Sequence, residues 1–188
     1  CDHYTLLHPQ LEIKSALEQY CKQGGSLKMT TGAAELDSLI DGIEEGLLYL
    51  FYGDPAPLEA LSYRLLVNCI LPVKLRHGFE SMAVCFNNTD YSGSRKVILN
   101  PERIANTAKV AGIDPMIVSK NLYIQTAYSS RHQVQVAKEI ASLIEENRNI
   151  KLIVINNFTK FFKESREERR LEIANDIKQV VAVIWRAC

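Results

Sequence analysis

A predicted turn over Gly53–Pro57 separates an apolar run from a stretch of helical periodicity that begins at Leu58, and this is where an α/β protein can carry a phosphate-binding loop. A functional loop reads G-x-x-x-x-G-K-[ST]; its backbone N–H groups cradle phosphates, its lysine reaches the outer ones and its hydroxyl binds magnesium. In this chain the positions are occupied by Gly53, Asp54, Pro55, Ala56, Pro57, Leu58, Glu59 and Ala60. Of the defining residues, only the first glycine is present.

The substitutions in this stretch remove the groups that would bind a triphosphate. Pro55 and Pro57 have no N–H to donate. Glu59 occupies the lysine position and would repel phosphate charge, and Ala60 lacks the hydroxyl. The stretch keeps the frame of a nucleotide-binding loop without its chemistry. Taken alone, it can also be interpreted as an ordinary strand–turn–helix in an α/β core.

Composition bounds the class of protein. The chain has 188 residues, which suggests one domain, and 47% of them are hydrophobic, as is usual in a globular protein. Lys plus Arg and Asp plus Glu each number 22, so any DNA site must be a local patch.

The five cysteines are scattered, and the odd count without a signal segment predicts a cytoplasmic or nuclear location. No apolar run approaches the ~20 residues of a membrane helix, so we expect no membrane contact.

Apolar runs alternate with stretches of helical periodicity along the chain. Strands are predicted over Ser26–Thr31, Leu47–Tyr52, Met82–Phe86, Leu122–Thr126 and Lys151–Ile155. Helices are predicted over Gln10–Tyr20, Ala33–Ile40, Leu58–Leu71, Glu102–Ala111, Gln133–Glu146 and Arg169–Cys188, with a short one from Asp114. This order predicts an α/β fold whose mostly parallel sheet carries helices on both faces. We assign residues 1–25 to an N-terminal helical extension or linker and residues 26–188 to the core.

Five segments, in chain order, resemble motifs of the RecA-type strand-exchange recombinases, and are most similar to the branch of archaeal RadA and its eukaryotic relatives. Met29–Gly46 resembles the segment that leads into the ATPase core, and Cys69–Pro72 resembles the C-x-L-P after its first helix. Asn100–Ile104 is similar to the family's RPERI, Ala127–Gln133 to its AYNxxHQ, and Lys151–Lys163 to its KLLIVDSLTxxFR. The resemblance implies a RecA-type P-loop ATPase core.

The resemblance also implies which positions would carry ATP hydrolysis, and the chain departs from the family at each. The Walker A lysine is replaced by Glu59, and the Walker B aspartate that helps organise magnesium is replaced by Asn156. The carboxylate that orients the attacking water falls on Thr89, or on Asp90 if the loop shifts by one residue. Because phosphoryl transfer depends on positioning and charge neutralisation, we predict a degenerate ATPase that is not an enzyme and uses no cofactor or metal.

The segment after the fourth core strand corresponds to the family's first DNA-contacting loop and is shorter here. Its basic residues could contact phosphates: Lys160, Lys163, Arg166, Arg169 and Arg170. The alternative is a solvated helix start in which Glu164, Glu167 and Glu168 pair with the arginines.

The family core continues with further strands, one of which lies between its first and fourth. We therefore expect a core that is incomplete at its C-terminal end and exposes apolar sheet edges. A partner, a swapped element or an altered strand order would compensate.

Together these features predict a catalytically inactive RadA-like paralogue that acts as an accessory protein in homologous recombination and DNA repair. Its partner would be a recombinase or another paralogue, in an oligomer or hetero-complex, with DNA contact as a further role. The alternatives are a stand-alone single-stranded DNA-binding module and a nucleotide-binding switch with an atypical P-loop. An atypical hydrolase that uses Asp90 and Glu59 is the least favoured.

Overall fold

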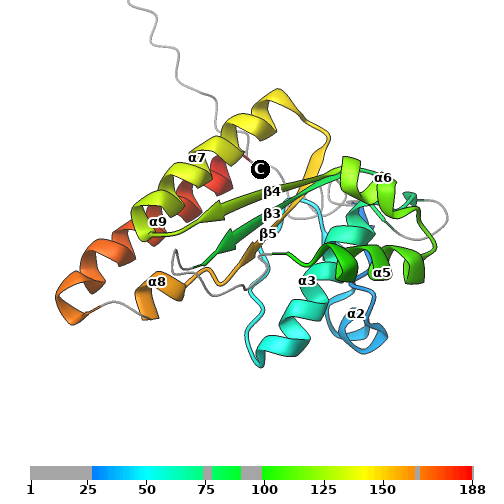
Figure 1. Cartoon of the computed structure of the whole chain (residues 1–188), viewed down its shortest axis with the longest axis horizontal. Helices are drawn as coiled ribbons and strands as arrows, with labels where there is room; N and C mark the ends of the chain where they lie inside the picture. Colours follow the sequence, from blue (N-terminus) through cyan, green and yellow to red (C-terminus); the bar gives the residue numbers. More distant parts are fainter. Residues whose placement is uncertain (1–26, 74–77, 90–98, 164–165, 188) are drawn as a thin grey trace, which may run out of the picture.

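The computed structural model describes residues 27–73, 78–89, 99–163 and 166–187 (Figure 1). The predicted helix Gln10–Tyr20, the residues assigned to the linker, Asp90 and Glu164 lie outside these ranges. Within them, no helix combines the length and the apolar character that a membrane span requires.

Three parallel strands form the central sheet. They are β3 (Met82–Asn88), β4 (Leu122–Ala127) and β5 (Ile150–Asn156), in the order β4-β3-β5. The middle strand β3 is buried along almost its whole length, and its apolar run Met82–Phe86 is typical of a strand covered on both faces. The predicted parallel α/β sheet is confirmed.

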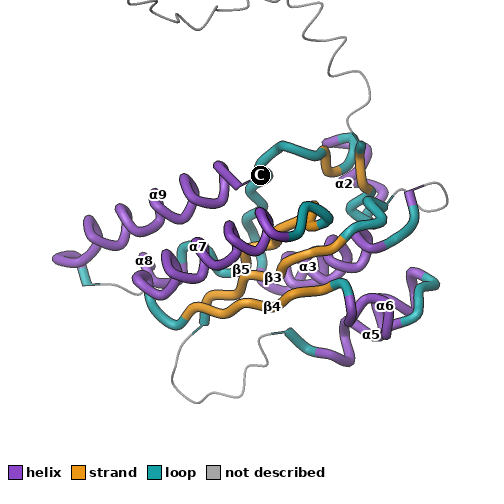
Figure 2. Tube along the Cα trace, turned by 90° about the horizontal axis from the view of Figure 1, so that it is seen from above, coloured by secondary structure: helices purple, strands orange, loops and turns teal. Residues whose placement is uncertain are grey.

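Helices cover both faces of this sheet (Figures 1 and 2). One face carries α3 (Pro55–Ile70), α5 (Pro101–Ala111) and α6 (Pro115–Lys120). The other carries α7 (Ser130–Glu146) and α9 (Arg170–Ala187), which lie side by side.

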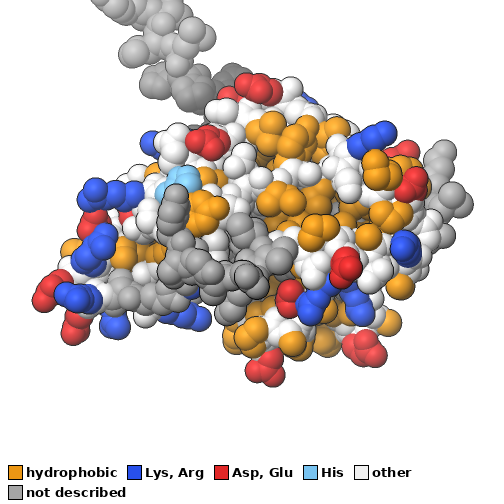
Figure 3. Space-filling model, in the orientation of Figure 1, with side chains coloured by type: hydrophobic (Ala, Val, Ile, Leu, Met, Phe, Trp, Pro, Cys, Tyr) orange, Lys and Arg blue, Asp and Glu red, His pale blue; other side chains and the backbone are white. Residues whose placement is uncertain are grey.

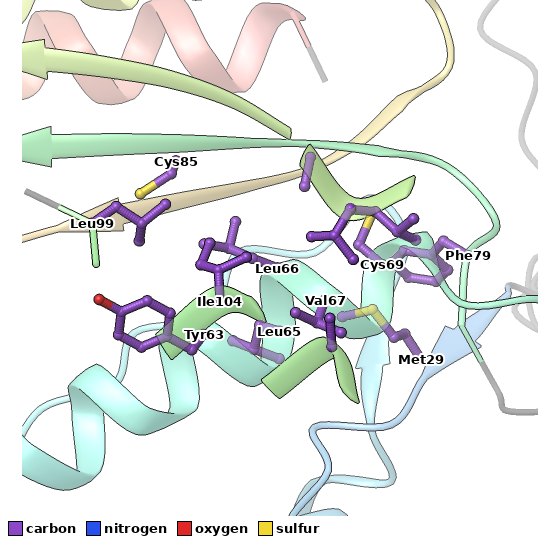
Figure 4. Packing of buried hydrophobic residues seen from close by; sticks show 14 of the residues in the cluster. Met29, Tyr63, Leu65, Leu66, Val67, Cys69, Phe79, Cys85, Leu99 and Ile104 are labelled. Carbon is purple, nitrogen blue, oxygen red and sulfur yellow. The ribbon is translucent and has the colours of Figure 1, made fainter. Parts of the chain in front are cut away.

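The middle strand joins the two helical layers, because successive side chains of a strand point to opposite faces. Ala83 and Cys85 belong to the core cluster with α3, α5 and α6, part of which Figure 4 shows. Val84 and Phe86 belong to a second cluster with α7 and α9.

Shorter elements flank the sheet. Near the start of the described chain, β1 (Lys28–Met29) pairs antiparallel with β2 (Ile43–Glu44), and α2 (Ala34–Ile40) lies between them in sequence. After β5, α8 (Lys160–Lys163) and the 3₁₀-helix η1 (Glu167–Arg169) lead into α9.

Side chains cap the start of three helices, and each cap is a residue type that favours this position. The Asn100 side chain accepts from the N–H of Glu102 at 2.9 Å and starts α5. Asp114 caps α6 in the same way, and Ser129 caps α7 by accepting from the N–H of His132.

The predicted strand over Leu47–Tyr52 is wrong, because this segment lies outside any helix or strand. Leu50 and Tyr52 are 79% and 89% exposed, whereas Tyr49 and Phe51 pack partly buried against the α3 side of the core. A strand needs a neighbour that satisfies its backbone, and no backbone hydrogen bond of the described chain joins this segment to β5. Among the described residues, no strand pairs with the outer edge of β5.

Candidate functional site

The residues that resemble a phosphate-binding loop lie at the N-terminus of α3. The helix begins at Pro55, so that the turn before it consists of Gly53 and Asp54, and the predicted turn over Gly53–Pro57 is too long. The early start has a physical reason: proline at the first helical position has a preset φ and lacks only an N–H that would be unpaired there.

This helix start offers few hydrogen-bond donors to an anion. Pro55 and Pro57 have no N–H, and the N–H of Leu58 donates to the Asp54 carbonyl at 3.4 Å. Of the first four helical residues, Ala56 therefore has the one N–H left for a ligand. A phosphate cradle uses several such groups.

Glu59, at the lysine position, forms an ion pair with Arg103 of α5. The Glu59 Oε2 lies 2.7 Å from the Arg103 guanidinium, and the two side chains are 51% and 57% exposed. The pair links α3 to α5 and neutralises the carboxylate within the chain. Because both side chains are solvated, it contributes only ~0–1 kcal/mol to stability.

Asn156 ends β5 and faces the second turn of α3. Its Oδ1 lies 2.8 Å from Ser62 Oγ, and its Nδ2 lies 3.6 Å from Cys85 Sγ. Burial raises the pKa of the Cys85 thiol to about 12, against the opposing effect of the Asn156 hydrogen bond. The amide at the Walker B position thus forms polar contacts with both the helix and the sheet.

Two further residues occupy the carboxyl ends of the strands. Asn88 is fully buried and its Nδ2 donates to the Asn156 carbonyl at 2.9 Å. Thr89 follows β3, and its N–H donates to the Ala127 carbonyl at 3.0 Å. Its side chain is a hydroxyl at the position where the resemblance implies a water-orienting carboxylate. Across the described ranges, no group of three or more His, Cys, Asp and Glu side chains could hold a metal ion.

The basic residues after β5 lie on α8, η1 and the start of α9. Glu172 binds two arginines: Arg131 at 2.8 Å and Arg169 at 3.6 Å. The Arg131 hydrogen bond is the main cause of the lowered pKa of the Glu172 carboxyl. In the part of the chain that the structure describes, three of the candidate cations form no ion pair: Lys163, Arg166 and Arg170.

Charge pairing on this surface differs from the predicted one. Glu167 and Glu168 form no ion pair with a described residue, and Glu172 takes the role expected of them. The left end of Figure 3, where α8 and the start of α9 lie, shows Lys and Arg side chains interspersed with acidic ones. The surface is mixed in sign, because the three unpaired cations lie close in sequence to the two unpaired glutamates.

Sequence reasoning missed Arg103 and Ser62. Arg103 stands inside the RPERI-like segment, which contributed only to the resemblance. Glu59 could have indicated it, because an acidic residue at the usual lysine position favours a basic partner on a neighbouring helix. Ser62 has no comparable signal, since one serine in a helix fits many environments.

The parallel sheet, its two helical layers and the strand-end position of Asn156 define a RecA-like α/β protein. Residues 22–183 match the Rad51 family model, and the chain belongs to the Rad51 family. The match spans most of the chain and confirms the resemblance to strand-exchange recombinases at the level of the family.

Proposed function

We propose that this Rad51-family chain is a catalytically inactive, RadA-like paralogue that acts as an accessory protein in homologous recombination and DNA repair. Family membership indicates the recombination and repair role. The observation that carries the finer proposal is the ion pair between Glu59 and Arg103 at 2.7 Å. It holds a neutralised carboxylate at the position where a functional loop presents its lysine to phosphate.

Three further features support loss of ATP hydrolysis. The start of α3 retains one free N–H in its first turn, so an anion would find little of a cradle. Asn156 is a neutral amide already in contact with Ser62, and Thr89 cannot act as a carboxylate base. Charge neutralisation, metal binding and water positioning would each lack their usual group.

A role through protein contacts is supported by the exposed apolar residues of the segment Leu47–Tyr52. Leu48 and Leu50 are 66% and 79% exposed, while their neighbours Tyr49 and Phe51 pack on the α3 side of the core. Contiguous exposed apolar residues of this kind are characteristic of protein-binding surfaces. The proposed partner is a recombinase or another paralogue of the same family.

Calorimetry with magnesium and ATP tests the loss of nucleotide chemistry. We expect no heat of binding at millimolar nucleotide and no phosphate release, while a Rad51-family recombinase with an intact loop serves as the positive control. Micromolar binding would favour the nucleotide-switch alternative. Magnesium-dependent turnover that Glu59→Ala abolishes would show that the chain is an enzyme and overturn the proposal.

Co-elution tests the accessory role. The purified chain is mixed with a recombinase of its own organism and analysed by size-exclusion chromatography with light scattering. A complex of defined stoichiometry is expected, and its absence with every family member of that organism would contradict an accessory role through these partners.

DNA contact is a second candidate function, favoured by Lys163, Arg166 and Arg170, which form no ion pair in the described chain. Replacing all three with glutamine should reduce the log–log salt slope of single-strand binding by about 2, since each phosphate contact contributes ~0.7. The matched control replaces three exposed lysines on other helices: Lys109, Lys120 and Lys138. Equal losses in both triple variants, measured by anisotropy of a labelled oligothymidylate, would show that the segment is no DNA site.

A further inference from the structure

We propose that the buried side-chain amides of Asn88 and Gln133 are positioning residues, which hold the basic segment after β5 in place for single-stranded DNA without any nucleotide. The inference rests on DNA contact, the second candidate function, and specifies how that contact is controlled. It follows from the hydrogen bonds of residues 157–159, which join β5 to α8 and are called the β5–α8 turn below.

Backbone hydrogen bonds at the start of α8 satisfy two carbonyls of the β5–α8 turn. The Asn157 carbonyl accepts from the N–H of Lys160 at 2.9 Å, and the Thr159 carbonyl accepts from the N–H of Lys163 at 3.0 Å. Asn157 has a left-handed φ of 54°, which asparagine adopts more readily than most residues. Two neighbouring carbonyls lie outside this backbone pattern, and a carbonyl withdrawn from water needs a donor.

Side-chain amides bind those two carbonyls. Asn88, at the end of β3, donates from Nδ2 to the Asn156 carbonyl at 2.9 Å. Gln133, in the first turn of α7, donates from Nε2 to the Phe158 carbonyl at 3.0 Å. The Asn157 Nδ2 in turn donates to the Asn88 carbonyl at 3.4 Å. The carbonyls of residues 156, 157, 158 and 159 are therefore all satisfied within the chain, and none requires a ligand.

The topology brings both amides to the turn. Because β3, β4 and β5 are parallel, the end of β3, the start of α7 and the β5–α8 turn all lie at the carboxyl edge of the sheet (Figure 1). The side chains of Asn88 and Gln133 are fully buried there, and Phe158 and Phe161 pack against the cluster with α7 and α9. Polar and apolar contacts thus anchor the turn, and Lys163 follows it on α8.

The two amides act on the turn as hydrogen-bond donors. Within the described ranges, Asn88 Oδ1 and Gln133 Oε1 are buried without a hydrogen-bond partner, whereas the nitrogen of each amide is engaged. A buried acceptor left unpaired lowers stability, so these residues are not placed for their oxygens. An ionised carboxylate at either position could not replace the amide, because it only accepts hydrogen bonds.

This anchoring involves no group that a nucleotide would move. Asn156, at the Walker B position, accepts from Ser62 of α3 at 2.8 Å through its Oδ1. The end of β5 is thereby joined to α3 by side chains of the chain itself. We therefore expect magnesium and ATP to leave the position of α8, and with it the affinity for DNA, unchanged.

Amide hydrogen exchange of the full chain, without nucleotide or DNA, tests the anchoring. Gln133→Met keeps a side chain of similar length and volume, and it removes one donor and an oxygen that has no partner in the described chain. We expect the amides of Lys160 and Lys163 to exchange about tenfold faster in this variant. The control is Ile144→Val, which removes one methyl group from a buried residue of the same helix, roughly 16 Å further along its axis. It should leave the exchange of these amides unchanged.

Single-strand binding gives the readout that a purely structural role would not change. It is measured by anisotropy of a labelled oligothymidylate, on chains whose circular dichroism shows them to be folded. Gln133→Met should bind about fivefold more weakly at ~0.1 M salt, with a log–log salt slope smaller by ~0.7, which is the loss of one phosphate contact. Ile144→Val should bind like the natural chain. Magnesium and ATP should change none of these affinities by more than about twofold.

The contrary outcomes separate this inference from the candidate function. If the natural chain binds the single strand but Gln133→Met leaves binding or amide exchange unchanged, the amide does not position the segment, and DNA contact stands without it. An affinity that rises about tenfold with magnesium and ATP would show that a nucleotide sets the position of the segment, which also overturns the inference. If the natural chain binds no single strand even at low salt, DNA contact itself fails, and the positioning role fails with it.

Discussion

At the residue scale, Glu59 is the position where the chain differs most in charge from a functional loop, and Arg103 is its counter-ion. We expect Glu59→Lys to change the free energy of unfolding by no more than ~1 kcal/mol, because the pair is exposed. The same substitution should not create ATP binding, since Pro55 and Pro57 still provide no N–H. Urea unfolding and calorimetry check the two expectations; micromolar ATP binding by Glu59→Lys would mean that charge alone had disabled the loop.

Asp37 gives the chain a pH-dependent contribution to stability. Burial acts to raise the pKa of its carboxyl, but hydrogen bonds from Thr30 and Thr31 outweigh this effect and lower the pKa below its usual value. A group whose pKa is lower in the folded state stabilises above its unfolded pKa, ~3.9, and that contribution is lost as pH falls through the folded value.

Asp37→Asn should therefore destabilise by ~1–3 kcal/mol near neutral pH, and the difference from the natural chain should shrink below about pH 4. Denaturant unfolding at a series of pH values measures it. Glu35→Gln, on an exposed position of the same helix, is the control and should show no such loss. A difference that stays constant with pH would contradict the assigned role of the carboxylate.

At the scale of elements, apolar runs located the sheet strands well, but the same signal failed at Leu47–Tyr52. Met82–Phe86 and Lys151–Ile155 were predicted within two residues of β3 and β5. Leu47–Tyr52 is as apolar as either, yet it forms no strand. The difference is non-local: strand formation depends on a neighbouring backbone, and no property of the segment's own residues reports whether one is there.

The candidate site shows the same division between local and non-local information. The types of Glu59, Asn156 and Thr89, and the missing N–H groups of the prolines, could be read from the sequence. Their contacts could not, because Arg103 and Ser62 come from segments distant from Glu59 and Asn156 respectively. The start of α3 at Pro55 was accessible in principle, since proline favours the first helical turn.

Within the layer formed by α7 and α9, apolar residues differ in how much each contributes to stability. Ile140 of α7 is fully buried in the cluster with Val84 and Phe86, so Ile140→Ala should cost ~2–5 kcal/mol of unfolding free energy. Leu171 of α9 is 75% exposed, and Leu171→Ala should stay within about 0.5 kcal/mol. Urea unfolding of the two variants checks the contrast, and similar costs would contradict the packing described for α7.

At the scale of the whole molecule, two buried thiols report on opening of the core. Burial raises the pKa of both Cys69 and Cys85 to about 12. The reactive thiolate is then far rarer than for an exposed thiol. In a variant with Cys1, Cys21 and Cys188 changed to serine, we expect a thiol reagent to label neither cysteine until the chain unfolds.

The labelling rate supplies the check. In the native state it should follow the unfolding rate measured independently by circular dichroism, and in denaturant both thiols should react at once. Rapid native-state labelling of one cysteine would show that its side of the core opens separately from the rest.

The position of β3 between the two helical layers determines how the molecule responds to a destabilising substitution. Its side chains alternate between the two core clusters. Residues that pack against α3 are therefore direct chain neighbours of residues that pack against α7 and α9. Neither layer can melt and leave β3 in place for the other, and the described core should therefore lose its structure in one cooperative transition. A destabilising substitution on one side of the sheet, such as Ile140→Ala, would therefore also lower the melting temperature of α3, α5 and α6 on the other side.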